Sequence, residues 1–432
     1  SQLSLLARLG SATETSEYSA YFSRDGSKPY DTYVAGYLSD GLEVTARIDV
    51  PPTAPPDTGF PVVIFVHGWY GRVGALAYDF MYDAESQYSE AIDYYVDRGF
   101  LVVSPSLRGH GSVNGVPADG IEFLEAWDNG SYISPIFYAI DVLNLVDSLG
   151  EIEPGQWPGA GIHADLSRIH ISGQSQGADA VLTALAVSGE GSMLENAFSS
   201  GSLWSGCFGP RFAQAEVYGP MSNTLEAFMS GDGSWTGTAA SADGSINPNF
   251  VFGWPPDWIG TTDTRSPEWT WQAENWAVAS VADSLQLKYS EMYDAVNALV
   301  ADIDDAAFEI EITANGKASV VHDPRISDAM SQIGGFGFAR YLTEPLLLHH
   351  SDRDYYSPPA WNADLATRIN ALGGFARDFT YPGNTHGLRV SEQVWFSPPG
   401  TVEGFELMHA REIPLMTGQD LEQISIDALR DL

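Results

Sequence analysis

The chain has 432 residues, and its 44% hydrophobic content is enough for a large buried core. Acidic residues outnumber basic ones by 57 to 20, so the formal net charge is −37. Because such a surface repels phosphate backbones and anionic lipid, we expect no nucleic-acid partner and no membrane insertion. The single cysteine, Cys207, excludes an intramolecular disulfide framework and a cysteine-based metal cluster.

The composition and the first residue also suggest a source and a location. Only three of the basic residues are lysines, and an acid-rich, lysine-poor surface suits salty water, where self-repulsion is screened. Our hypothesis is a marine or halophilic source. The chain begins at Ser1 rather than at a methionine, which fits a mature form without its signal peptide. We therefore expect a secreted or periplasmic location, with a cytoplasmic one as the alternative.

The first half of the chain alternates strand and helix patterns. Two strand-like stretches, 31–37 and 43–50, flank a turn and predict a hairpin ahead of the main body. The apolar run PVVIFVHG, 61–68, is typical of a strand buried on both faces. A second buried strand is expected over 100–105 and a helix over 133–149. This alternation favours an α/β fold with a mostly parallel sheet.

The pattern continues in SRIHISGQSQGADAVLTALAVSG, 167–189, which indicates a strand, a sharp turn and a helix. A further strand is expected over 197–204. After a long insertion the alternation resumes with a strand in EPLLLHHSDRD, 344–354, and a helix over 359–372. The stretch ARDFTYPGNTHGL, 376–388, predicts a last strand that ends in a loop.

These elements suggest five segments. We expect a small N-terminal β extension packed on the core over 1–58, and the core itself over 59–206 and 339–400. The tryptophan-rich insertion 207–338 is interpreted as a cap, or lid, over the carboxyl ends of the strands. The tail 401–432 is amphipathic and acidic, which predicts a helix docked on the body or an interaction arm.

The stretch Gly173-Gln174-Ser175-Gln176-Gly177 has the G-x-S-x-G pattern of a nucleophile elbow. It lies between a predicted strand and a predicted helix, which is the context that the pattern requires. Such a turn holds the serine in a strained conformation, and a side chain at either flanking glycine would clash. The alternative interpretation is a glycine-rich loop without chemistry.

A serine nucleophile needs a histidine base and a carboxylate that orients it. In α/β-hydrolase sheets the acid and then the histidine follow the serine, each at the end of a strand. The loop after the strand PLLL supplies Asp352 and Asp354, and the loop after the last strand supplies His386. Serine, acid and histidine therefore occur in the expected order.

The sequence resembles α/β-hydrolase-fold serine hydrolases, in the branch that holds prolyl-oligopeptidase-like peptidases and the acetyl xylan esterase, or cephalosporin deacetylase, type of carboxylesterase. The resemblance covers residues 60–386 apart from the insertion and is carried by the motifs HGWYGR, SLRGHG, GQSQG, SDRDYYSPP and YPGNTHG. It implies Asp354 as the triad acid, because the spacing to Pro358 matches the family, with Asp352 as the alternative. Ser357 stands where the family usually has valine.

The same considerations predict an oxyanion hole. One donor is the backbone N–H of Gln176, the residue after the nucleophile. The resemblance implies the backbone N–H of Trp69 as the second donor, with Tyr70 as the alternative.

We expect a serine esterase that cleaves small-molecule carboxylic esters through an acyl-enzyme, without a cofactor and without a metal ion. Tyr70, Trp254 and Trp258 are candidate pocket residues, although tryptophans of the insertion equally suit its own core. The alternative function is a prolyl-oligopeptidase-like peptidase or amidase. A catalytically inactive binding module is the remote alternative. The sequence does not define the oligomeric state.

Overall fold

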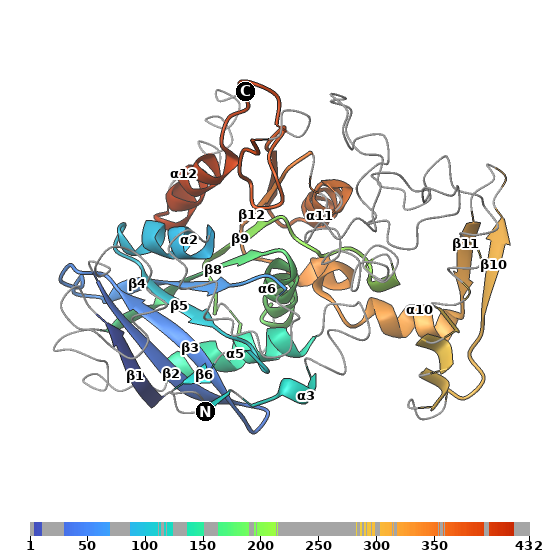
Figure 1. The fold of residues 1–432 in the computed structure, drawn as a ribbon, viewed down its shortest axis with the longest axis horizontal. Helices are drawn as coiled ribbons and strands as arrows, with labels where there is room; N and C mark the ends of the chain where they lie inside the picture. The colour runs from blue at the N-terminus through green and yellow to red at the C-terminus, as the bar shows by residue number, and fades with distance from the viewer. Residues whose placement is uncertain are drawn as a thin grey trace.

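The computed structural model (Figure 1) describes residues 4–10, 30–69, 87–110, most of 112–123, 136–150, 163–189, most of 194–214, scattered positions between 282 and 298, most of 303–352, 354, 357, 359–392 and 397–418. In this part of the chain, nine strands form one sheet in the order β1-β2-β3-β5-β4-β8-β9-β12-β13. The pairs among β1, β2, β3 and β5 are antiparallel. The pairs from β5 to β13 are parallel.

The strands have the following bounds, in chain order: β1 Ser4–Gly10, β2 Asp31–Ser39, β3 Leu42–Val50, β4 Phe60–Val66, β5 Leu101–Pro105, β8 Ala164–Gln174, β9 Ser200–Trp204, β12 Leu346–His350 and β13 Ala376–Thr380. The predicted α/β fold with a mostly parallel sheet is confirmed. The hairpin expected as an N-terminal extension is part of the same sheet, because β3 pairs with β5 from Ala46 to Asp49. Its residues thereby extend the sheet of the core.

Helices cover both faces of the sheet (Figure 1). The helices α5, α6 and α11 pack on one face and α2 and α12 on the other; their bounds are α2 Gln87–Val96, α5 Phe137–Gly150, α6 Gln176–Val187, α11 Pro359–Ala371 and α12 Gly404–Met416. Side chains alternate between the faces along a strand. In β4, Val62 and Ile64 therefore belong to the first core, and Val63 and Phe65 to the second.

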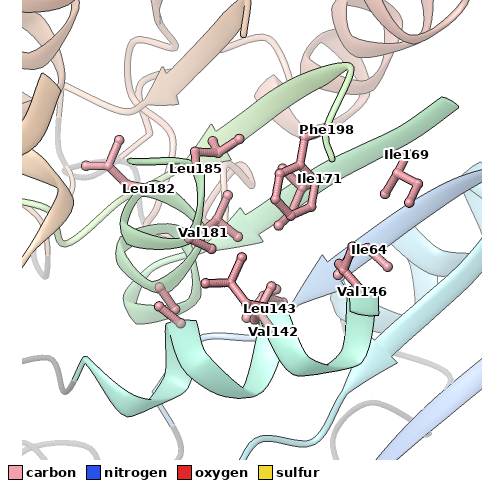
Figure 2. Close-up of a cluster of buried hydrophobic side chains, with 14 of the residues drawn as sticks. Ile64, Val142, Leu143, Val146, Ile169, Ile171, Val181, Leu182, Leu185 and Phe198 are labelled. Carbon is pink, nitrogen blue, oxygen red and sulfur yellow. The ribbon is translucent and has the colours of Figure 1, made fainter. Parts of the chain in front are cut away.

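Figure 2 shows the first core between α5, α6 and the sheet. Ile64 and Ile171 of the central strands lie against Val142 of α5 and Val181 of α6, and all four are fully buried. Full burial of each such side chain stabilises the fold by about 1.5–3 kcal/mol. This core supports β4 and β8, the strands that precede the predicted oxyanion loop and the predicted nucleophile. No helix among the residues described is long and apolar enough to cross a membrane.

The described part of the insertion contains the hairpin β10 Phe308–Ile312 and β11 Ala318–His322, then α10 Pro324–Ser331. The 3-10 helix η3 Gly335–Tyr341 spans the end of the insertion. Figure 1 shows β10, β11 and α10 together at one side of the molecule, away from β1 to β3. They have a small core of their own around Tyr289 and Ile326. The pocket candidates Tyr70, Trp254 and Trp258 lie outside the described residues, so the cap and its aromatic pocket stay predictions.

The C-terminal helix α12 is docked on the second core through Phe405 and Met408. It also carries a buried carboxylate, Glu412, toward the sheet. One oxygen of Glu412 accepts the Tyr95 hydroxyl at 2.7 Å, and the other accepts the hydroxyl of Ser202 in β9. His409 Nδ1 lies 2.8 Å from the first oxygen. The structure therefore has the docked helix over 404–416, whereas residues 419–432 lie outside the described chain.

Buried histidines make the fold sensitive to acid. His349 of β12 is fully buried, with Nδ1 2.8 Å from the Tyr381 hydroxyl. Burial is the main cause that lowers its pKa from 6.5 to about 3; neighbouring Arg411 and His409 lower it further, and Glu412 opposes them. Because the unfolded chain binds this proton more tightly than the folded chain, stability falls as the pH drops from about 6.5 toward 3.

We expect a His349→Asn variant, which cannot take up this proton, to be less sensitive to acid. Between pH 7 and pH 5 its free energy of unfolding should fall by about 2 kcal/mol less than that of the wild type. Urea unfolding of both proteins at the two pH values measures this difference. Equal losses would show that His349 is not the group responsible.

Candidate active site

Ser175 lies at the sharp turn where β8 ends and α6 begins. Its backbone has φ 56° and ψ −123°, a conformation that is strained for a residue with a side chain. A Cβ on Gly177 would collide with the carbonyl oxygens of Val66 and His67, and one on Gly173 would lie 2.7 Å from the Gly177 oxygen. The two glycines are thus required because the turn packs directly on β4 and on itself.

Ser175 does not use its side chain to cap α6. Its Oγ lies 3.4 Å from the Sγ of Cys207, in the loop that follows β9. The backbone N–H of Cys207 also donates to the Ser175 carbonyl at 3.2 Å. Sequence reasoning missed this neighbour, since a lone cysteine 32 residues away has no pattern that links it to the elbow.

Asp354 and His386 form a hydrogen-bonded pair. His386 Nδ1 lies 2.7 Å from Oδ1 and 2.9 Å from Oδ2 of Asp354, whose side chain is fully buried. The backbone N–H of Ser357 donates to the same Oδ1 at 2.9 Å. The Ser357 hydroxyl donates to the carbonyl of Gly206, next to Cys207. Ser357 thereby joins the acid loop to the loop beside Ser175.

Asp352 has a different partner. Its Oδ1 accepts the backbone N–H of Gly383 at 2.8 Å, in the loop that leads from β13 to His386. A carboxylate in this position stabilises the loop and has no contact of this kind with the imidazole. The hydrogen bonds therefore favour Asp354 over Asp352 as the partner of His386.

The sheet explains why these residues approach one another. Ser175, Asp354 and His386 follow β8, β12 and β13, which are parallel and lie within the order β8-β9-β12-β13. Parallel strands end at the same edge of a sheet, where α/β proteins form their sites. The structure joins Asp354 to His386 by hydrogen bonds and places the strained Ser175 at the same edge, two strands from β12.

The predicted oxyanion loop follows β4, the neighbour of β8. Trp69, with 44% of its surface exposed, directly follows Gly68 in this loop. Buried His67 precedes Gly68, with Nδ1 2.7 Å from the Gly68 carbonyl and Nε2 3.1 Å from the Ser106 carbonyl. Burial lowers the pKa of His67, and the two carbonyl contacts oppose this shift. Gln176 is the first residue of α6, so its N–H lies at the helix end that favours negative charge.

The remaining histidines of the core have structural partners. His170 Nδ1 lies 2.8 Å from the Ser200 hydroxyl, and His350 Nε2 lies 3.2 Å from Asp378 Oδ1. His110 lies edge-on to His67 and has Nδ1 3.2 Å from the Arg108 carbonyl. In the described chain no group of three or more His, Cys, Asp or Glu side chains is arranged to hold a metal ion.

A mostly parallel sheet with helices on both faces, and a strand, elbow and helix around Ser175, define the α/β-hydrolase fold. No protein-family model and no curated protein matches the sequence.

Solved structures with similar folds include esterases and peptidases. One is Est1E from Butyrivibrio proteoclasticus, at 13% identity and a TM-score of 0.41, over 89% of this chain and 99% of that one. Another is the acylaminoacyl peptidase of Pyrococcus horikoshii, at 17% identity and a TM-score of 0.48, over 95% of this chain and 46% of that one. A puromycin-hydrolyzing peptidase of Mycobacterium tuberculosis has 15% identity and a TM-score of 0.45, over 90% and 40% of the two chains.

Proposed function

We propose that the protein is a serine hydrolase that cleaves carboxylic esters with a triad of Ser175, His386 and Asp354. The observation that carries this proposal is the buried Asp354 hydrogen-bonded to His386 Nδ1 at the sheet edge that also holds the strained elbow serine. This bond fixes the histidine as the tautomer with a proton on Nδ1, so Nε2 is the nitrogen that accepts a proton.

The chemistry follows from these roles. Ser175 Oγ attacks the ester carbonyl carbon while His386 Nε2 takes its proton, and the carbonyl oxygen becomes an oxyanion. The backbone N–H groups of Gln176 and Trp69 stabilise that charge. His386 then protonates the departing alcohol, which leaves an acyl-enzyme on Ser175. A water molecule, deprotonated by His386, hydrolyses the acyl-enzyme and restores the serine.

An ester is preferred over an amide for two reasons that come from the sequence. The elbow GQSQG and the histidine loop GNTHG resemble the deacetylase branch of the family, and the 207–338 insertion suits a lid over a small or hydrophobic ester. Discrimination between esters and amides depends on the pocket. The peptidase is the competing candidate.

A matched panel of substrates distinguishes the esterase from the peptidase. We would compare p-nitrophenyl esters from acetate to octanoate with aminoacyl and prolyl p-nitroanilides, at low and high salt, and subtract the activity of Ser175→Ala. We expect ester turnover that depends on Ser175, with the best acyl length reporting the pocket size. Anilide cleavage in excess of ester cleavage would contradict the ester proposal and identify a peptidase. The absence of any turnover that depends on Ser175 would contradict the hydrolase itself.

A further inference from the structure

A single phenol connects the predicted oxyanion loop to the nucleophile elbow. The hydroxyl of Tyr88, in α2, accepts the backbone N–H of Gly68 at 3.0 Å. The same hydroxyl donates to Oε1 of Gln174 at 2.6 Å. Gly68 precedes Trp69 in the loop after β4, and Gln174 precedes Ser175 at the end of β8. Two adjacent strands are thereby linked at the point where each leaves the sheet.

The link requires Tyr88 to stay protonated, because a phenolate has no hydrogen to donate to Gln174. Burial, the main cause, raises the pKa of Tyr88 well above the usual range of tyrosine. The ring is held by the second core, with its centroid 5.8 Å from that of Phe65 and 6.5 Å from that of Trp204. The hydroxyl is therefore presented from a rigid position.

The loop has no room to move toward the elbow. A Cβ on Gly68 would collide with Gln174 Oε1 and would lie 2.8 Å from the Tyr88 hydroxyl and 3.0 Å from the Ser175 Cβ. The backbone of Gly68 thus lies directly against the side chain of Gln174 and against the nucleophile residue. Its N–H is taken by Tyr88, which agrees with the assignment of the following N–H, that of Trp69, as the donor in the proposed mechanism.

We infer that Tyr88 and Gln174 are positioning residues that fix the distance between the two halves of the oxyanion hole, the Trp69 N–H on the loop and the Gln176 N–H on the elbow. This inference rests on the proposed function. Oxyanion donors act only if they are held where charge develops, and a displacement of about 1 Å lowers the rate severely. The residues act on the transition state and not on the binding of the ground-state ester.

The test is Tyr88→Phe, which removes the hydroxyl and keeps the ring in the core. We expect kcat for p-nitrophenyl acetate to fall about 10-fold to 100-fold, while KM changes less than about 3-fold. This fall in kcat is no larger than the fall caused by removal of one oxyanion donor. Tyr95→Phe is the matched control, since Tyr95 lies two turns further along α2 and its buried hydroxyl donates to Glu412 instead. It should lower the melting temperature and leave kcat unchanged.

A second variant tests the link itself. Gln174→Met keeps the length of the side chain and removes the acceptor, so it should lower kcat like Tyr88→Phe. Because both changes break the same chain of hydrogen bonds, the double variant should be no slower than the slower single variant. Additive losses, or a Tyr88→Phe enzyme with wild-type kcat, would overturn the inference. Activity that survives Ser175→Ala would instead overturn the proposed function, so the two failures are distinguishable.

Discussion

Replacement of Ser175 by alanine is expected to lower kcat for a p-nitrophenyl ester by about 10⁶-fold. The reason is that the variant has no oxygen with which to form the acyl-enzyme, although the oxyanion donors and the bound conformation of the substrate are kept. A residual rate of about 10³-fold to 10⁴-fold over water is therefore expected from those donors. Stopped-flow release of p-nitrophenol measures both the burst and the steady-state rate, and the burst should disappear.

The matched control for this experiment is Cys207→Ala. The thiol of Cys207 lies 3.4 Å from the Ser175 hydroxyl and is itself a potential nucleophile. We expect the variant to keep its burst and a kcat within about 10-fold of the wild type, since the thiol takes no part in the steps of this mechanism. A Ser175→Ala enzyme that keeps its burst, together with a Cys207→Ala enzyme that loses it, would assign the acyl group to the cysteine.

Replacement of Asp354 by asparagine is expected to lower kcat by about 10⁴-fold. The asparagine amide favours the wrong tautomer of His386 and cannot stabilise the imidazolium that forms when the serine proton is taken. The fall should be concentrated in kcat because the side chain of Asp354 is fully buried and acts through His386. Steady-state kinetics on the same ester measure it.

Asp352→Asn provides the comparison for this variant. Its side-chain oxygen would still accept the Gly383 N–H, so we expect kcat within a few-fold of the wild type. If Asp352→Asn lost activity and Asp354→Asn kept it, the roles of the two carboxylates would be reversed. The pair of variants thus decides a choice that the sequence left to a resemblance.

The features that could be predicted from the sequence are those fixed by local patterns. The run from Phe60 to Val66 is apolar at every position, and the strand β4 contributes to both cores. The elbow could be located because the geometry of the turn dictates glycine at 173 and 177. The hairpin over β2 and β3 was also predicted, but its pairing partner was not. Alternation indicates a strand without indicating its neighbour, and the pairing with β5 depends on residues about 55 positions away.

The supporting contacts of the site could not be predicted because they join segments that are distant in the sequence. The Ser357 hydroxyl bonds the Gly206 carbonyl across 151 positions, and Tyr88 reaches Gln174 across 86. In a chain of this size, a serine after an acid, or a tyrosine in an amphipathic helix, has many possible hydrogen-bond partners. Only the packing of the whole sheet decides which hydroxyl faces which carbonyl.

The burial of Glu412, a residue of α12, has a consequence for the synthesis of the protein. Tyr95 and Ser202 leave the ribosome long before Glu412, from which Tyr95 is separated by 317 positions. Until that carboxylate arrives, these buried hydroxyls lack their final acceptor, and the second core is open to water where α12 belongs. Translation from the N-terminus therefore produces a nearly complete sheet that exposes apolar surface, and such surfaces are recognised by chaperones. Helix α12 therefore closes the second core after the strands beneath it have been synthesised.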